Sequence, residues 1–175
     1  MNLKSFTRAA RKVPAIGIGT LSSGDIEYAA LGSIAEHSAP ESLTWEIGSI
    51  TKVFTGILLA DMSLRDEVDL DDPIGAHVPD EVAARMPELE LQPTLADLSS
   101  HTAGLPRIPK EWFKRLRGSD DPYSQLTEDD VWDFLGPKTL RPRKRRSRYS
   151  NYGVGLLGQV LARAAGTEYP TLVTD

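Results

Sequence analysis

The sequence contains no cysteine, which excludes disulfide bonds, thiolate catalysis and cysteine-ligated metal sites. Histidine is scarce as well. The three histidines, His37, His77 and His101, are far apart and lack the spacing that is typical of metal ligands. No other pattern implies an organic cofactor, so we expect the protein to work with neither a metal nor a cofactor.

Long apolar runs are also absent. A membrane-spanning helix needs about 20 predominantly apolar residues, and no window of the sequence approaches that length. Near the N-terminus, Arg8, Arg11 and Lys12 interrupt any apolar run, so the core of a signal peptide is missing. We predict a soluble, cytoplasmic protein with no membrane partner.

An overall excess of basic charge is lacking too. The chain has 20 Lys and Arg against 25 Asp and Glu, which gives a net charge of −5. Nucleic-acid-binding domains are usually basic, so we expect no nucleic-acid partner. One local exception is Arg141–Arg148, which is basic except for Pro142 and Ser147. We interpret this run as a solvated loop, with an anion-binding or nucleic-acid-binding patch as the alternative.

The front of the chain predicts a β-hairpin. Val13–Thr20 and Ile26–Leu31 are apolar segments that flank the turn-forming run Ser22–Asp25. No strong strand pattern follows Leu31, and an isolated hairpin is only marginally stable in water. We therefore expect an antiparallel sheet that is incomplete in this chain, with an open edge that is a candidate for self-association.

Helical patterns dominate the rest of the sequence. Apolar residues recur with helical spacing from Gly48 to Met62, on more than one face, which predicts a mostly buried helix with Ser49 in its first turn. Further helices are predicted over Thr94–Ser100, from Thr127, and over Asn151–Ala165 with Gly166 as the C-cap. The length favours one domain, residues 1–175, with a hairpin region at 1–45 and a helical region at 46–175.

The run Ser49-Ile-Thr-Lys52 could support nucleophilic catalysis. Residues three apart share one face of a helix, so a hydroxyl and an amine would lie together. A serine needs a base within hydrogen-bond reach, and a lysine serves only if burial or a neighbouring cation lowers its pKa. We expect the apolar helix to bury Lys52. The competing interpretation is a capping serine followed by a solvated lysine.

The run Tyr149-Ser-Asn151 precedes the last predicted helix. A phenol beside a lysine ammonium loses its proton more readily, and it could then exchange a proton with the serine or with a leaving group. An asparagine amide offers one donor and one acceptor group to a substrate amide. The competing interpretation is a helix N-cap at Ser150 or Asn151, with Tyr149 engaged in packing.

Four segments occur in a particular order along the chain. They are Ile47-Gly-Ser-Ile-Thr-Lys-Val-Phe-Thr-Gly, Leu70-Asp-Asp-Pro, Leu98-Ser-Ser-His-Thr-Ala-Gly-Leu-Pro and Tyr149-Ser-Asn-Tyr-Gly-Val-Gly-Leu-Leu-Gly. In this combination the sequence resembles the serine β-lactamase-related family, which includes class C β-lactamases, D-alanyl-D-alanine carboxypeptidases and related esterases. The resemblance implies an α+β fold in which an antiparallel sheet packs against a helical region.

The resemblance also implies a role for each matching residue. Ser49 matches the serine that becomes acylated, Lys52 the lysine beside it, Tyr149 the tyrosine base and Asn151 the asparagine that contacts the substrate. His101 falls in a loop that we interpret as structural, through packing or capping. The implied activity is hydrolysis of a β-lactam, a D-alanyl peptide or a small ester through an acyl-serine intermediate, with the backbone N–H of Ser49 as one oxyanion donor.

The sequence departs from the family pattern after the tyrosine motif. The family has a third motif, Lys-Thr-Gly or His-x-Gly, on a later strand that supplies the second oxyanion donor, whereas this sequence reaches Asp175 without one. Lys138-Thr-Leu140 precedes Tyr149 and has leucine where glycine is needed. We therefore expect a truncated chain whose C-terminal strands are missing. Two alternatives to hydrolysis stay open: a non-catalytic binding module and a degraded fragment of the same family.

Overall fold

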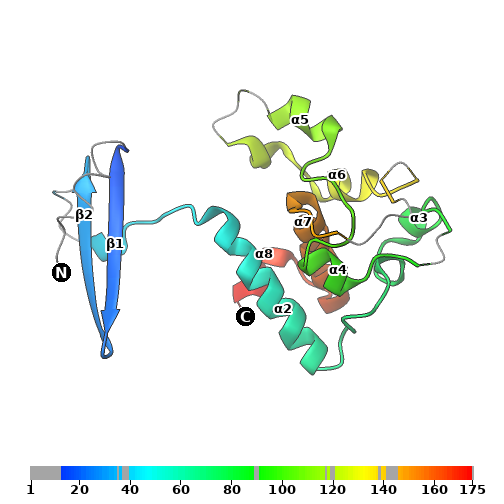
Figure 1. The fold of residues 1–175 in the computed structure, drawn as a ribbon, viewed down its shortest axis with the longest axis horizontal. Helices are drawn as coiled ribbons and strands as arrows, with labels where there is room; N and C mark the ends of the chain where they lie inside the picture. The colour runs from blue at the N-terminus through cyan, green and yellow to red at the C-terminus, as the bar shows by residue number, and fades with distance from the viewer. Residues whose placement is uncertain are drawn as a thin grey trace. The chain divides into compact units, whose positions relative to one another are not determined.

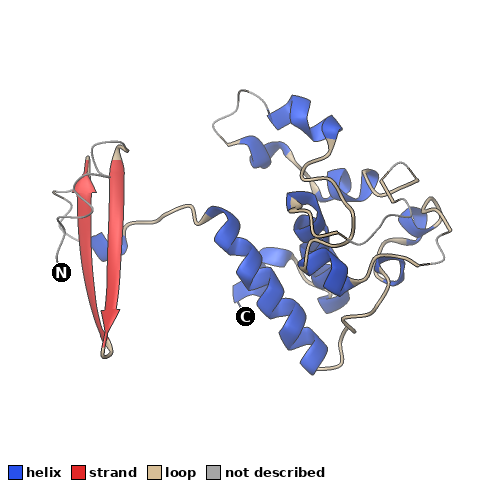
Figure 2. Ribbon diagram, viewed as in Figure 1, coloured by secondary structure: helices blue, strands red, loops and turns tan. Residues whose placement is uncertain are grey.

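The computed structural model describes residues 13–34, 36, 40–88, 91–116, 118, 121–137, 139–140 and 146–174. The chain divides into two compact units, Met1–Ile47 and Gly48–Asp175. Among the described residues, both strands belong to the first unit and the α-helices belong to the second (Figures 1 and 2). Residues 1–12, His37, Lys138 and residues 141–145 of the basic run lie outside the described residues.

The first unit is the predicted hairpin. Strand β1 (Ala15–Ser22) pairs antiparallel with β2 (Asp25–Gly32), with Ser22 opposite Asp25 at the turn. Ser23 and Gly24 both have a positive φ, of 52° and 92°, as a two-residue type I′ turn requires. Among the described residues these are the only two strands of the sheet, and the chain leaves β2 towards the 3-10 turn η1 (Pro40–Ser42).

Trp45 packs on the backbone of Gly17 within the same unit. A Cβ atom on Gly17 would lie 2.7 Å from Cζ2 of the Trp45 ring, closer than two carbon atoms can approach. The glycine in β1 is therefore required by the indole that covers it, which is the usual meaning of a glycine inside a strand.

The described part of the second unit consists of two long helices, α2 and α7, and several short ones. The α-helices are α2 (Thr51–Leu64), α3 (Asp80–Ala83), α4 (Leu95–Ser99), α5 (Lys110–Leu116), α6 (Glu128–Asp133), α7 (Asn151–Ala165) and α8 (Tyr169–Thr174). Three 3-10 turns connect them: η2 (Gly48–Ile50), η3 (Ile74–Ala76) and η4 (Pro122–Gln125). Among the described residues, none of the helices has the combination of length and hydropathy that spanning a membrane requires.

Helix α7 forms the centre of this unit, in contact with α2, α4, α6 and α8 (Figure 1). Its limits agree with the prediction: the Ser150 hydroxyl caps the first turn by accepting from the N–H of Gly153, and Gly166 ends the helix with φ 66°. Tyr152 is 1% exposed, its ring meets those of Trp112 and Phe134 edge-on, and its hydroxyl donates to the Val131 carbonyl.

The predicted starts of two short helices are confirmed. Thr94 and Thr127 both form capping boxes, in which the threonine hydroxyl accepts from the N–H of Asp97 or Asp130 and that aspartate accepts from the threonine N–H. These reciprocal bonds satisfy N–H groups that would otherwise lack a partner at the helix start, so they fix where α4 and α6 begin.

The expectation of a mostly buried helix after Gly48 is wrong for α2. Only Thr55, Leu59 and Met62 are buried in it, whereas Val53 and Ile57 are each 58% exposed. The reason is that α4, α7 and α8 meet one side of α2, and apolar residues on a second side need a further layer. Ser49 also lies outside the α-helix, in the preceding 3-10 turn η2.

We expect Leu157→Ala in α7 to lower the free energy of unfolding of the helical unit by about 2–5 kcal/mol, because the side chain is fully buried and its removal leaves a cavity. The matched control is Leu64→Ala in α2, where the leucine is 86% exposed and the expected change is within about 0.5 kcal/mol. Urea unfolding followed by circular dichroism measures both. Equal midpoints for the two variants would contradict the placement of α7 at the centre of the core.

Candidate functional site

Three of the predicted site residues meet at one oxygen atom. Lys52 Nζ donates to Ser49 Oγ at 3.3 Å, and the Tyr149 hydroxyl donates to the same Oγ at 2.7 Å. The Lys52 ammonium also lies 5.1 Å from the centre of the Tyr149 ring. The serine and the tyrosine are 100 positions apart in the sequence, so tertiary structure creates this arrangement. A nucleophile with a proton-accepting group within hydrogen-bond reach has the arrangement that acyl transfer requires.

Local structure places each of the three side chains. Gly48 has φ 53°, a left-handed conformation that lets the chain turn sharply into η2, where Ser49 lies. Lys52 follows in the first turn of α2, so it projects near Ser49 from the same side of the helix. Tyr149 comes directly before Ser150, the N-cap of the central helix α7. The triad is therefore assembled where the starts of α2 and α7 meet.

The loop before α5 holds the tyrosine segment against the rest of the unit. Ser150 Oγ donates to the Pro106 carbonyl at 2.6 Å, and the backbone N–H groups of Asn151 and Tyr152 both donate to the Arg107 carbonyl. The first N–H groups of a helix have no partner inside the helix, and here the preceding loop supplies one. The position of Tyr149 is thus set by backbone contacts on its C-terminal side.

The pKa of the Tyr149 phenol is lowered from its usual 10.0. The largest cause is the hydrogen bond with Ser49, which can donate its proton to the phenolate, followed by the interaction with Lys52. The Arg107 guanidinium, 5.6 Å from the ring centre, adds a smaller electrostatic contribution in the same direction. The phenolate, the form of Tyr149 that can accept a proton, is therefore more populated near neutral pH than in an isolated tyrosine.

The site is more open than we expected. Ser49 is exposed, Tyr149 is 41% exposed and Lys52 is only half-buried. The expectation that the apolar helix buries Lys52 is therefore not met, for the reason given above for α2: its second apolar side has no cover within the helical unit. In this structure the three side chains interact through hydrogen bonds and charge at a solvent-exposed surface.

Asn151 is not hydrogen-bonded to the other three predicted residues in the described structure. Its Nδ2 donates to the hydroxyl of Tyr123 in η4 at 3.1 Å, and its Oδ1 is buried with no hydrogen-bond partner among the described residues. A buried acceptor without a partner is costly. Tyr123 was not predicted as a site residue, and no sequence signal pointed to it, because the contact joins η4 to α7 across a stretch with no recognisable motif.

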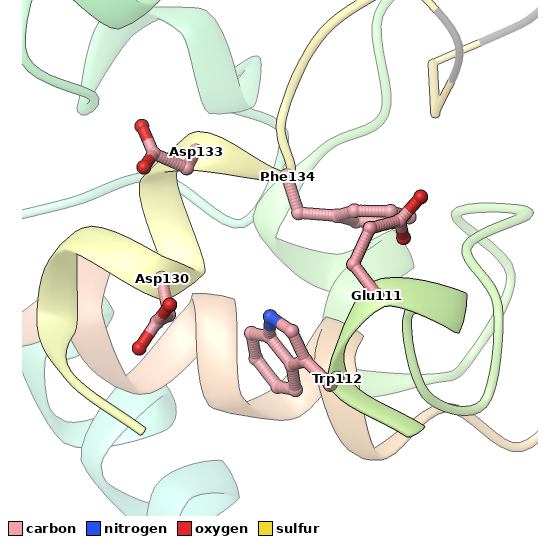
Figure 3. Close-up of a pocket in the computed structure, with 5 residues that line it drawn as sticks. All are labelled: Glu111, Trp112, Asp130, Asp133 and Phe134. Atoms are coloured by element: carbon pink, nitrogen blue, oxygen red, sulfur yellow. The ribbon is translucent and has the colours of Figure 1, made fainter. Parts of the chain in front are cut away.

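A small pocket lies elsewhere, between α5 and α6. Its lining includes three carboxylates, Glu111, Asp130 and Asp133, around the rings of Trp112 and Phe134 (Figure 3). Asp130 belongs to the capping box of α6, and Asp133 pairs with Arg85 at 3.3 Å. Within the part of the chain that the structure describes, no group of three or more such side chains is placed to hold a metal ion. This pocket is therefore explained by helix capping and surface ion pairing.

Comparison with known proteins places the chain in one family. The family model described as "Beta-lactamase" matches residues 6–175. Beta-lactamase-like protein 2 of Dictyostelium discoideum is 32% identical over 154 residues, and a D-alanyl-D-alanine carboxypeptidase/endopeptidase of Escherichia coli is 30% identical over 131 residues. These matches cover 85% and 74% of this chain but only 27% and 32% of the two relatives.

Solved structures agree in fold. The octameric penicillin-binding protein homologue of Pyrococcus abyssi superposes with a TM-score of 0.77 at 27% identity, covering 99% of this chain and 42% of that one. A β-lactamase/D-alanine carboxypeptidase of Yersinia pestis superposes with a TM-score of 0.76 at 23% identity, covering 98% and 49%. The chain spans less than half of each of these structures and about a third of the curated relatives.

We expect the pKa of Tyr149 to lie below 10 and to rise in Ser49→Ala, because that variant removes the largest cause of the lowered value. Ultraviolet difference titration of each protein against its Tyr149→Phe counterpart isolates the phenol of interest. Tyr152 does not interfere, since burial raises its pKa well above that of an exposed tyrosine. A Tyr149 titration that is the same with and without the Ser49 hydroxyl would show that the two groups are not hydrogen-bonded in solution.

Proposed function

Because this chain belongs to the β-lactamase family, we propose that it contributes the nucleophile and the proton-transfer groups of a serine hydrolase that works through an acyl-serine intermediate on Ser49. Its fold is the N-terminal part of the α+β arrangement seen in the solved β-lactamases and penicillin-binding proteins. The observation that supports the proposal most directly is the pair of hydrogen bonds that Lys52 and Tyr149 make to Ser49 Oγ.

The first half of the reaction forms the acyl-enzyme. Ser49 Oγ attacks the carbonyl carbon of the substrate while its proton passes to Tyr149, whose lowered pKa favours the phenolate. The Lys52 ammonium stabilises that phenolate by its charge. The carbonyl oxygen becomes an oxyanion, and the backbone N–H of Ser49 beside the start of α2 is one donor for it. Tyr149 then returns the proton to the leaving nitrogen or oxygen as that bond breaks.

The second half releases the product. Water attacks the acyl carbon and gives one proton to Tyr149, and the oxyanion forms again at the same place. When the bond to Ser49 breaks, the proton returns to Oγ and the carboxylic acid leaves. Tyr149 thus acts as a base towards the attacking oxygen and as an acid towards the leaving group in both halves.

Asn151 is proposed as the group that orients a substrate amide. Its Oδ1 is buried and lacks a partner among the described residues, so a substrate N–H would satisfy it only once the side chain turns this oxygen towards the substrate. Tyr123 holds the other end of the amide through Nδ2, which fixes the plane of the Asn151 side chain. A polar group held in this way discriminates strongly against substrates that leave it unpaired.

The proposed substrates are β-lactams, D-alanyl peptides and small esters. Two kinds of relative support this range: the Escherichia coli relatives are a D-alanyl-D-alanine carboxypeptidase/endopeptidase and a β-lactamase. All three substrate classes present a carbonyl carbon that a serine hydroxyl can attack, with the serine becoming acylated. Because the chain spans less than half the length of its relatives, activity of the whole protein is part of the proposal, including a second oxyanion donor from a third motif.

A fluorescent penicillin or a fluorescent phosphonate should label the protein covalently, and Ser49→Ala should abolish the label. Tyr149→Phe should slow labelling by about 10²- to 10⁴-fold, the usual contribution of a positioned acid–base group. Ser63→Ala is the matched control, since it removes a hydroxyl from the same helix α2 and should label like wild type. The label is read by gel fluorescence and its position by mass spectrometry of peptides.

A folded wild-type protein that resists both probes would favour the first alternative, a binding module that keeps the family cleft without its chemistry. A mass that grows with concentration in light scattering would favour the second, a fragment that self-associates through the open edge of its two-stranded sheet. Labelling at a residue other than Ser49 would reject the assignment of the nucleophile while leaving hydrolysis itself open.

A further inference from the structure

His101 adopts a backbone conformation that side chains usually avoid. It follows α4 and its C-cap Ser100 with φ 62°, in the left-handed region. Few residues other than glycine occupy this region, although histidine is among those that do so more often than most. A residue in such a conformation is held there by contacts with its surroundings.

The contacts of His101 lie on both sides of Tyr149. Its carbonyl accepts from the N–H of Arg148 at 2.8 Å, and its ring Nδ1 accepts from the N–H of Ser150 at 3.3 Å. The imidazole ring itself rests on the Tyr149 ring, with centroids 4.7 Å apart and planes inclined by 50°. His101 therefore contacts Arg148, Ser150 and the ring of Tyr149.

The left-handed conformation explains how a single residue makes all three contacts. The backbone of His101 turns at this point, so that its carbonyl faces the N–H of Arg148 while its side chain reaches the N–H of Ser150. The carbonyls of Pro106 and Arg107 grip only the C-terminal side of Tyr149, from Ser150 onward. On the N-terminal side His101 holds the backbone of Arg148, and it adds an aromatic contact to the Tyr149 ring beside the Lys52 and Arg107 cations.

We propose that His101 is a positioning residue, which holds the Tyr149 hydroxyl against Ser49 and does so only while its imidazole is neutral. The proposal rests on the proposed function, since the hydroxyl it positions is the proposed proton-transfer group. Nδ1 must carry a lone pair to accept from the Ser150 N–H, so the ring proton sits on Nε2. Protonation of Nδ1 would replace an acceptor by a donor facing another donor.

The same geometry separates positioning from direct proton transfer. A general base needs a free lone pair near the proton that it removes. In His101 the lone pair of Nδ1 points at the Ser150 N–H, and Nε2 carries the proton of the neutral ring. In this arrangement His101 acts on Ser49 through the placement of Tyr149 and not by taking its proton.

The charged and titratable groups around His101 favour the neutral ring. Partial burial and, next, the positive charge of Lys52 lower the pKa of His101 from its usual 6.5. Tyr149 faces the imidazole, and the Arg107 guanidinium faces the Tyr149 ring as a further positive charge. Because the pKa is lowered in the folded protein, the contact is fully present above 6.5 and is lost only as the pH falls through the lower, native value.

Two substitutions separate the side chain from the backbone. His101→Gly suits φ 62° better than histidine does, so the fold is kept while the Nδ1 acceptor and the ring are removed. His101→Asn keeps an acceptor, Oδ1, at nearly the same place, and asparagine tolerates the left-handed region. A small displacement of a catalytic group can cost on the order of 100-fold in rate. We expect His101→Gly to lose about that factor in the rate of labelling by fluorescent penicillin, and His101→Asn to regain most of it.

The pH profile gives a readout that a purely structural role would not move. Wild-type labelling should fall at acid pH through the titration of His101, and His101→Asn should lack that fall because its amide does not titrate. A profile with the same acid limb in both proteins overturns the proposal. Labelling of His101→Gly at the wild-type rate overturns it as well, while the loss of label in Ser49→Ala leaves the proposed function standing.

A second measurement does not need any reaction. If His101 holds Tyr149 against Ser49 and Lys52, the pKa of Tyr149 should rise towards 10 in His101→Gly and stay lowered in His101→Asn. Ultraviolet difference titration reads this value whether or not penicillin labels the protein. If wild type does not label at all, the proposed function fails, and an unchanged Tyr149 titration in His101→Gly would then reject the positioning role separately.

Discussion

Two hydrogen bonds converge on the Oγ of Ser49, one from the ammonium of Lys52 and one from the hydroxyl of Tyr149. Both donors must reach the same atom, which requires that the starts of α2 and α7 stay within a side chain's length of each other. The segments between α2 and α7 help to keep the two helix starts together. Packing in the helical unit brings α2 and α7 into contact. The loop from His101 to Arg107 then holds the segment around Tyr149 at the start of α7.

The site is held mainly by backbone groups and by residues that do no chemistry. The carbonyl of Arg107 accepts two N–H groups at the start of α7, and Ser150 joins the cap of that helix to the Pro106 carbonyl. On the other side, the Thr55 hydroxyl is hydrogen-bonded to that of Tyr169, which ties α2 to α8 at 2.6 Å. Such connections keep functional side chains in place without occupying the face that a substrate would approach.

Much of this was predictable where the signal is local. Ser150 and Gly166 mark the ends of α7 by their own capping chemistry, and Thr94 and Thr127 do the same for α4 and α6. The spacing of Ser49 and Lys52 places both on one face whatever surrounds them.

The rest depended on contacts between distant segments. Helical spacing shows that α2 is apolar on two sides, but it does not show that the unit covers only one of them. The bond between Asn151 and Tyr123 and the grip of His101 on Tyr149 join segments far apart in the chain, and neither leaves a pattern in the sequence. The family resemblance placed His101, Tyr149 and Asn151 in motifs without giving their geometry, and it did not point to Tyr123.

Ser49 and Tyr149 are separated by 100 positions in the sequence, so the chain must close a long loop to bring them together. Closing so long a loop costs entropy that the packed core between the two residues must offset, so we expect the contact between the two hydroxyls to form only after that core has assembled. A molecule that is collapsed but not yet ordered would carry the same two residues without their meeting. Covalent capture of Ser49 would therefore count native molecules in a mixed population, and refolding could be timed by the return of that reactivity.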